Sequence, residues 1–188
     1  MESGQHTIHK YLVQRSQQGD RQAQNELYKL YVKAMYNICR RMMGDEEEAR
    51  DVLQDAFITA FSMINSLKSE VTFSAWIKRI VVNHCLNALK KRKLMTVAME
   101  DHQDFEEEQE VDLDYSKYEA RRVLEAIDQI SEGCKTVLNL YLFEGYDHKE
   151  IGEILGITES ASKAQYSKAK SKVRKILSIK DKVHERQA

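Results

Sequence analysis

The chain has 188 residues, of which 42% are hydrophobic and 31% charged, and its formal net charge is −1. This composition favours soluble helical domains over a disordered chain, and no apolar run approaches the roughly 20 residues of a membrane-spanning helix. The absence of proline and the presence of only seven glycines disfavour a sheet-rich fold with many tight turns. The N-terminus lacks the apolar stretch of a signal peptide. We therefore expect a cytoplasmic, all-α protein that is not inserted in a membrane.

The small net charge hides a strong division along the sequence. Residues 94–116 contain nine carboxylates and no Lys or Arg, whereas residues 163–188 contain nine basic residues and two acidic ones. Because the acidic segment lacks hydrophobic periodicity, we predict a flexible linker that is extended by self-repulsion. This linker separates two small helical domains, predicted at residues 1–93 and 117–188.

The N-terminal domain begins with two predicted helices. A short helix around residues 8–15 ends near Gly19, and a longer one is capped by Asp20 and closed by Gly44. The residues that share the predicted apolar face of the longer helix are Leu27, Leu30, Tyr31, Ala34, Met35, Ile38 and Met42.

A third helix is predicted from Glu46 to Leu67, with acidic residues at its N-terminus, where the helix dipole favours negative charge. Its inward face is predicted to comprise Ala49, Val52, Leu53, Ala56, Phe57, Ala60, Phe61 and Ile64. Its outer side comprises Asp51, Gln54, Asp55, Ile58 and Thr59. An exposed Ile58 among acids and an amide is unusual for a purely solvated face.

The fourth predicted helix spans Phe73–Lys93, after a polar loop at Asn65–Thr72. Its broad apolar side comprises Trp76, Ile77, Ile80, Val81, Leu86 and Leu89. Its polar stripe comprises Arg79, Asn83, Asn87 and Lys90, at steps of four, four and three residues. Amides beside cations on one helix face can contact base edges and phosphates. Equally, the face can be simply solvated, with its final lysines complementing the helix C-terminal dipole.

The C-terminal domain is predicted to hold four helices, the last two joined by a tight turn. The two supporting helices contain Ala120, Val123, Leu124 and Ile127, and Val137, Leu138, Leu140, Tyr141 and Leu142. Asp147 caps the third helix, Gly156 ends it, and Thr158 begins a strongly basic fourth helix. A positive second helix after a tight turn is typical of a helix-turn-helix that enters a DNA major groove. An ordinary helical hairpin with a solvated lysine face is the alternative.

Candidate catalytic and metal sites are missing from the sequence. No Gly-rich phosphate loop, HExxH or GxSxG motif occurs. Cys39, Cys85 and Cys134 are widely spaced and odd in number, which favours small core residues over zinc ligands or a disulfide framework. His84 and His148 are isolated on helical patterns. We therefore expect a binding protein rather than an enzyme, with no cofactor, metal or small-molecule substrate.

Both halves of the chain resemble one family, the bacterial RNA polymerase sigma factors of the extracytoplasmic-function (ECF) type. DVLQDAFITAF at 51–61 resembles the second conserved region where it docks on polymerase, and FSAWIKRIVVNHCLNALKKRK at 73–93 resembles the helix that binds the −10 promoter element. The sequence from Leu124 to Leu177 resembles the fourth conserved region, which binds the −35 element. The resemblance covers almost the whole chain in the expected order.

The resemblance implies partners and roles for individual residues. The expected partners are core RNA polymerase, promoter DNA and an anti-sigma factor. The residues implied in polymerase binding are Asp51, Gln54, Asp55 and Ile58. Those implied at the −10 element are Arg79, Asn83, Asn87, Lys90 and Lys91, with the loop Asn65–Thr72 helping to hold a flipped base. Those implied at the −35 element are Lys163, Gln165 and Ser167 as base contacts and Lys168 as a phosphate contact. Trp76 is assigned to the core rather than to strand separation.

Two other functions stay open from the sequence. A stand-alone helix-turn-helix regulator would account for Tyr146–Lys175 but would leave Asp51–Phe61 and the polar stripe without a purpose. A helical adaptor with no nucleic-acid role would leave both basic faces merely solvated.

Overall fold

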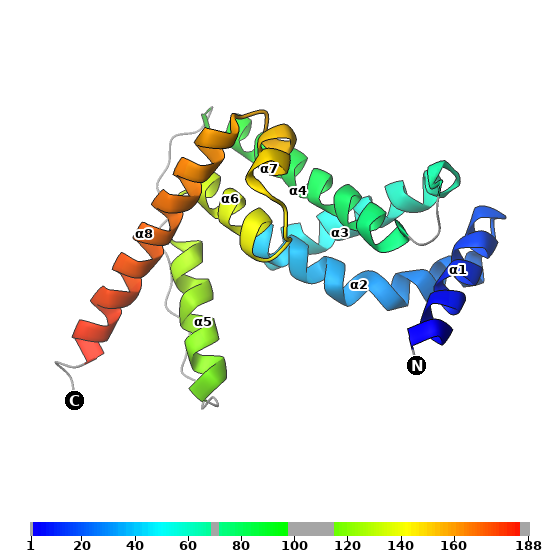
Figure 1. Cartoon of the computed structure of the whole chain (residues 1–188), viewed down its shortest axis with the longest axis horizontal. Helices are drawn as coiled ribbons and strands as arrows, with labels where there is room; N and C mark the ends of the chain where they lie inside the picture. Colours follow the sequence, from blue (N-terminus) through cyan, green and yellow to red (C-terminus); the bar gives the residue numbers. More distant parts are fainter. Residues whose placement is uncertain (1, 69–71, 98–114, 185–188) are drawn as a thin grey trace. The chain divides into compact units, whose positions relative to one another are not determined.

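The computed structural model describes residues 2–68, 72–97 and 115–184. These ranges are helical and contain no strand, which confirms the predicted all-α fold (Figure 1). The chain divides into two compact units, Met1–His102 and Gln103–Ala188. Within the described ranges, no helix combines the length and hydropathy that crossing a membrane requires.

The N-terminal unit is a helical bundle closed by a short helical turn. Its elements are α1 (Glu2–Gln17), α2 (Arg21–Met43), α3 (Glu46–Ser62), the 3-10 helix η1 (Ile64–Ser66) and α4 (Phe73–Val97). Helices α2, α3 and α4 pack against one another, while α1 packs on α2 and reaches η1. The largest side chains buried at their centre are Val13, Leu27, Cys39, Phe73, Ile77, Val81, Val82 and Cys85.

The start and end of α2 are those that its sequence predicts. The Asp20 carboxylate accepts hydrogen bonds from the backbone N–H groups of Gln22 at 2.8 Å and Ala23 at 3.2 Å. Gly44 adopts the left-handed conformation with φ of 80°, which a residue without Cβ reaches at little cost. The predicted apolar face is wrong at Leu30, which is 51% exposed, and at Ala34, which is exposed as well. The buried face is turned toward Cys39 and Met43 because α2 packs against α3 and α4 together.

Helix α3 buries the predicted face but ends earlier than predicted. Residues 49, 52, 53, 56, 57 and 60 are buried, as their spacing predicts. The N–H of Met63 is shared between the carbonyls of Thr59 at 3.0 Å and Ala60 at 3.2 Å, which tightens the last turn. The chain then continues as η1 rather than as α-helix, and Ile64 remains buried. Hydrophobic spacing does not distinguish these two outcomes, because both bury Ile64.

The C-terminal unit consists of α5 (Tyr115–Asp128), α6 (Glu132–Leu142), α7 (His148–Leu155) and α8 (Glu159–His184). Helix α8 packs against the other three. One core cluster comprises Ala126, Ile127, Ile130, Cys134, Leu138, Ala169 and Val173. Of the apolar residues named for this helix, Val123 and Leu124 are exposed, because α5 presents Ala126 and Ile127 to α8. All three cysteines are free and buried, as predicted.

The acidic segment predicted as a linker is helical at both edges. Helix α4 continues to Val97, because the LMTV sequence after Lys93 contains no helix breaker, and α5 begins at Tyr115. The remainder of that segment, residues 98–114, lies outside the described residues.

Candidate functional site

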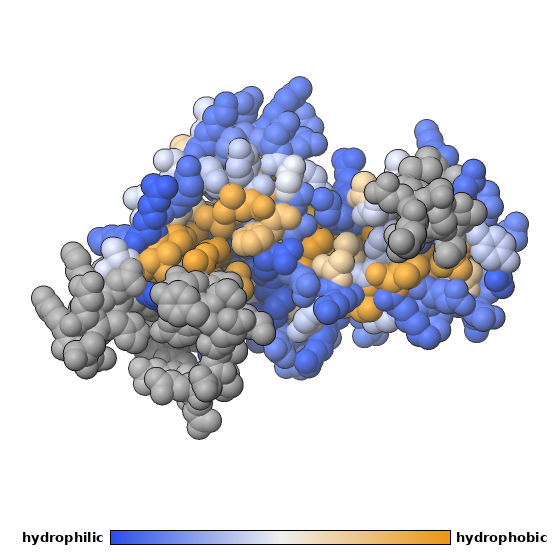
Figure 2. Space-filling view, turned by 60° about the horizontal axis from the view of Figure 1, so that its bottom comes forward, coloured by the Kyte–Doolittle hydropathy of each residue, from blue (hydrophilic) through white to orange (hydrophobic). Residues whose placement is uncertain are grey.

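The outer side of α3 carries an exposed apolar side chain beside a hollow. Ile58 is 60% exposed, and Asp51, Gln54 and Asp55 are exposed on the same helix. The hollow has a volume of about 420 Å³ and is lined by Tyr28, Arg50, Leu53, Gln54, Phe57, Ile58 and Phe61. Hydrophobic residues reach the molecular surface in several places between hydrophilic ones (Figure 2). A hollow with an aromatic floor and an exposed Ile58 at its edge can seat apolar side chains of a protein partner.

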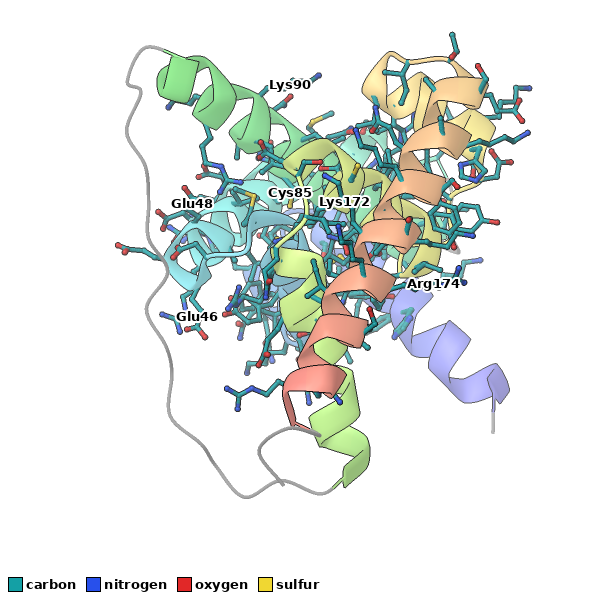
Figure 3. The ribbon with its side chains drawn as sticks, turned by 90° about the vertical axis from the view of Figure 1, so that its left-hand side faces the viewer. Glu46, Glu48, Cys85, Lys90, Lys172 and Arg174 are labelled. Atoms are coloured by element: carbon teal, nitrogen blue, oxygen red, sulfur yellow. The ribbon has the colours of Figure 1, made fainter. Side chains whose placement is uncertain are left out.

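Helix α4 places its predicted polar stripe on the surface. Arg79, Asn83, Asn87 and Lys90 are all exposed, and so is Lys91. Figure 3 shows Lys90 extending away from α4. This stripe therefore offers amide groups and positive charges to solvent along one helix face, the combination that can contact both bases and phosphates.

Not every basic residue at the end of α4 belongs to that surface. Arg92 donates to the Glu48 carboxylate at 3.0 Å and to the backbone carbonyl of Met43 at 3.2 Å. Glu48 lies in the first turn of α3 (Figure 3). Arg92 thus ties α4 to the α2–α3 turn. Trp76, predicted in the core, is half-buried, with its ring 5.9 Å from that of the buried Phe73.

In the C-terminal unit, α7 and α8 form a tight helix-turn-helix. The Asp147 side chain accepts from the N–H of Glu150 while the Glu150 side chain accepts from the N–H of Asp147, a complete capping box. Gly156 ends α7 in the left-handed conformation with φ of 69°. A Cβ on Gly152 would lie 2.8 Å from the carbonyl oxygen of Ile157, so the turn can fold back closely on α7 only because this residue is glycine.

A cluster of rings and hydroxyls fixes α8 on its neighbours. The His148 ring stacks on Tyr141 of α6 at 4.5 Å and meets the edge of Tyr166 of α8 at 5.5 Å. His148 Nδ1 also lies 3.0 Å from Oγ of the buried Ser162. Lys170 places its ammonium 4.5 Å from the centre of the Tyr166 ring. The isolated His148 of the sequence is therefore a contact between three helices.

The exposed face of α8 contains most, but not all, of the residues predicted to contact DNA. Lys163, Ser167 and Lys168 are exposed, whereas Gln165 is half-buried, with its Oε1 close to Gly133 of α6. The centre of the exposed face carries small residues, spaced by three or four positions: Ser160, Ala164, Ser167 and Ser171. Basic residues flank this row, and Figure 3 shows Arg174 among them, extending from its helix. The helical spacing of exposed small residues was the signal that could have identified this row.

An ion pair lies at the N-terminal end of this face. The Lys163 ammonium is 2.6 Å from the Glu159 carboxylate, one helical turn away. The hydrogen bond from Lys163 lowers the pKa of Glu159, and the same bond raises the pKa of Lys163. Both groups therefore stay charged at neutral pH, and Glu159 offsets part of the positive charge that Lys163 offers to a partner.

No cluster of three or more His, Cys, Asp or Glu side chains suited to a metal occurs in the part of the chain that the structure describes. The arrangement is one of binding surfaces: an apolar hollow and a polar stripe on one unit, and a basic helix face on the other.

Comparison with known proteins identifies the family. The family model "Sigma-70 region 2" matches residues 27–94, and "Sigma-70, region 4" matches residues 120–173. The ECF RNA polymerase sigma-E factor of Haemophilus influenzae is 30% identical over 155 residues, which cover 77% of this chain and 82% of that protein. The chain belongs to the ECF family of RNA polymerase sigma factors.

Other relatives agree with this assignment. The RNA polymerase sigma-H factor of Pseudomonas aeruginosa is 28% identical to this sigma factor over 177 residues, 88% of this chain and 92% of that protein. Among solved structures, the sigma factor RpoE in complex with the anti-sigma factor NepR from Bartonella quintana has a similar fold. Its TM-score is 0.57 at 17% identity, over 82% of this chain and 96% of that one.

Proposed function

We propose that this sigma factor binds core RNA polymerase and directs transcription initiation at promoters by contacting a −10 and a −35 element. The observation that carries the proposal is the presence of region 2 and region 4 in that order, each on a separate unit with an exposed polar or basic helix face. Two weak contacts joined in one chain reinforce each other, because the first contact raises the effective concentration of the second. We place the protein in the cytoplasm, where polymerase and promoter DNA lie.

The polymerase contact is assigned to the hollow on α3. Ile58 supplies exposed apolar area, and Gln54 lies in the same lining. Asp51 and Asp55, one helical turn apart on the same helix, add negative charge beside Ile58, suited to a partner with positive charge next to an apolar centre. In this proposal Ile58 is the anchor, and the two carboxylates orient the partner.

The −10 contact is assigned to the α4 stripe. Asn83 and Asn87 are amides one turn apart, and an amide can bond in a bidentate way to adenine. Arg79, Lys90 and Lys91 contribute charge for phosphate contacts along the same surface.

The −35 contact is assigned to α8. Ser167 lies at the centre of the exposed face, where a small side chain lets the helix approach the base edges, while Lys163 and Lys168 flank it. Gln165 keeps its proposed role as a base contact, which requires its side chain to turn away from Gly133. A helix whose exposed face carries small side chains at its centre and basic ones on both sides can enter a DNA major groove.

An anti-sigma factor is a further proposed partner, supported by the similar fold of RpoE, which was crystallised with one. The polymerase contact has a direct test. Ile58→Asp should abolish binding to core polymerase in a pull-down with purified components, while Thr59→Asp, at the neighbouring half-buried position, should retain it. If both variants bind as the wild type does, the α3 assignment is wrong.

A stand-alone helix-turn-helix regulator is the second candidate, supported by the α7–α8 geometry alone. It predicts specific duplex binding without polymerase, whereas a sigma factor predicts specificity that depends on polymerase.

A further inference from the structure

Glu159, the first residue of α8, lies beside the helix face that is proposed to bind the −35 element. Its carboxylate pairs with the Lys163 ammonium at 2.6 Å, and both residues are exposed. Because the two residues are four positions apart, they lie on one side of the helix. Lys163 flanks the row of small residues at the centre of the exposed face, so this ion pair lies where DNA would approach.

The first turn of α8 fixes the backbone from which Glu159 extends. The Thr158 hydroxyl accepts a hydrogen bond from the N–H of Ala161 at 3.1 Å, which caps the helix. The same hydroxyl lies 3.0 Å from Oγ of Ser160. A carboxylate in the first turn is also favoured by the helix dipole. Glu159 is therefore an ordered partner for Lys163.

The surroundings of Glu159 contain a second negative charge. The hydrogen bond from Lys163 lowers the pKa of Glu159, against the opposing effect of Asp147, the carboxylate that caps α7. Glu159 is therefore ionised at neutral pH, and Asp147 acts on the same space. A DNA phosphate that approached Lys163 would be repelled by both carboxylates. The backbone of DNA is thus an unfavourable partner for Lys163 in this position.

The Lys163 ammonium retains donors for an uncharged partner. An ammonium has three hydrogens to donate, and the bond to Glu159 uses one of them. Two remain, which is the number that a lysine uses when it binds the O6 and N7 atoms of guanine in the major groove. A base edge carries no net charge, so the carboxylates do not repel it as they repel a phosphate.

From this arrangement we propose that Glu159 is a positioning residue that determines specificity: it keeps Lys163 from the DNA backbone and commits the ammonium to a guanine of the −35 element. The inference rests on the proposed function. Specificity of this kind comes from repulsion of the wrong contact as well as attraction to the right one. Without the carboxylate, Lys163 would be free to bind a nearby phosphate, which strengthens binding but carries no sequence information.

The test uses the full chain with core polymerase. Base preference is measured with a promoter library randomised over the −35 element, with transcripts counted by sequencing, and affinity by fluorescence anisotropy of a −35 duplex at several salt concentrations. Glu159→Gln keeps the side-chain size and an oxygen that can accept from Lys163, but it removes the charge. Glu125→Gln is the matched control, because Glu125 pairs with Arg121 at the same spacing on α5, at 3.0 Å.

We expect Lys163→Ala to lower the preference for guanine at one −35 position about fivefold or more. Glu159→Gln should lower the preference at that same position by a similar factor. It should also steepen the slope of log affinity against log salt concentration by about 0.9, the value of one added phosphate contact. Glu125→Gln should change neither quantity, because a pair that only stabilises its helix affects neither base preference nor the number of phosphate contacts.

An unchanged slope in Glu159→Gln would overturn the inference even if the base preference fell, because a loosened helix would produce that fall alone. An unchanged guanine preference, a preferred base other than guanine at the position sensitive to Lys163→Ala, or the same changes in Glu125→Gln would overturn it too. If the wild-type chain shows no preference at any −35 position, the proposed function fails as well. If the wild type shows the preference and Glu159→Gln matches the wild type, only the inference about Glu159 fails.

Discussion

His148 Nδ1 lies 3.0 Å from Oγ of Ser162, and this contact joins the first residue of α7 to a fully buried side chain of α8. The same imidazole stacks on Tyr141 with the ring planes 16° apart. The direction in which α8 leaves the turn is therefore set by a contact between α6, α7 and α8 as well as by the turn itself. Because α8 is the helix proposed to bind the −35 element, this contact affects both the stability of the C-terminal unit and the orientation of the helix that binds DNA.

We predict that Ser162→Ala destabilises the C-terminal unit by about 1 kcal/mol, because it removes one buried hydrogen bond. The single tryptophan of the chain, Trp76, lies in the N-terminal unit and reports on that unit alone. Chemical unfolding followed by circular dichroism should show the loss, whereas tryptophan fluorescence should not. Ser167→Ala, on the exposed face, is the control and should be nearly neutral. Equal effects of the two substitutions would contradict the role of the His148–Ser162 contact.

Gly152→Ala is predicted to destabilise the same unit by about 1–3 kcal/mol, the cost of forcing extra volume into a close contact. The added Cβ would meet the Ile157 carbonyl at 2.8 Å, so the turn between α7 and α8 would have to shift. The control is Glu153→Ala, an exposed change on the same helix. Circular dichroism measures stability, and binding of duplex −35 DNA by the full chain with polymerase measures function. A neutral Gly152→Ala would show that the turn is more adaptable than this geometry implies.

Asp20 makes the stability of the N-terminal unit depend on pH. The backbone N–H of Ala23, with further bonds from Arg15 and Gln22, lowers the pKa of Asp20 below its ordinary value of 3.8. A carboxyl with a lowered folded-state pKa contributes stability above its unfolded pKa, and that stability is lost as the pH falls through the folded-state pKa. Asp20→Asn keeps a capping side chain but does not titrate. The Trp76 unfolding midpoint of the variant should therefore fall less than that of the wild type between about pH 5 and pH 2. Parallel curves for the two proteins would refute this.

Lys163 and Lys168 should differ in their effect on DNA binding, although both are exposed lysines of α8. Each phosphate contact contributes about 0.9 to the slope of log affinity against log salt concentration. Lys168→Ala should reduce this slope by about 1. Lys163→Ala should reduce it less, because Glu159 already holds that ammonium at 2.6 Å. Fluorescence anisotropy with a −35 duplex, measured with polymerase at several salt concentrations, decides between them. Equal changes in slope would mean that Lys163 leaves Glu159 on binding.

Local signals predicted most of the helical boundaries. Asp20, Asp147, Gly44 and Gly156 each act within a few residues of their own position, and each caps or ends the predicted helix. The inward face of α3 was predictable too, because its apolar residues recur at helical spacing along one side of the helix.

Features that depend on distant packing were not predictable from spacing. Leu30 and Leu124 are apolar residues at the edge of a helix face, and which edge is buried depends on where the neighbouring helices lie. The half-burial of Gln165 depends on α6, and the hydrogen bonds that the Gln17 side chain donates to backbone carbonyls reach across 47 and 50 residues. Sequence periodicity contains no information about such contacts, although it placed Ile58 and the α4 stripe on exposed faces.

Run-off transcription with purified core polymerase, with and without this chain, tests the central claim most directly. The account predicts promoter-specific transcripts only when the chain is present, and their loss with Ile58→Asp, which leaves the DNA-contacting faces intact. Specific binding of duplex DNA by the chain alone, with no transcript when polymerase is added, would contradict it.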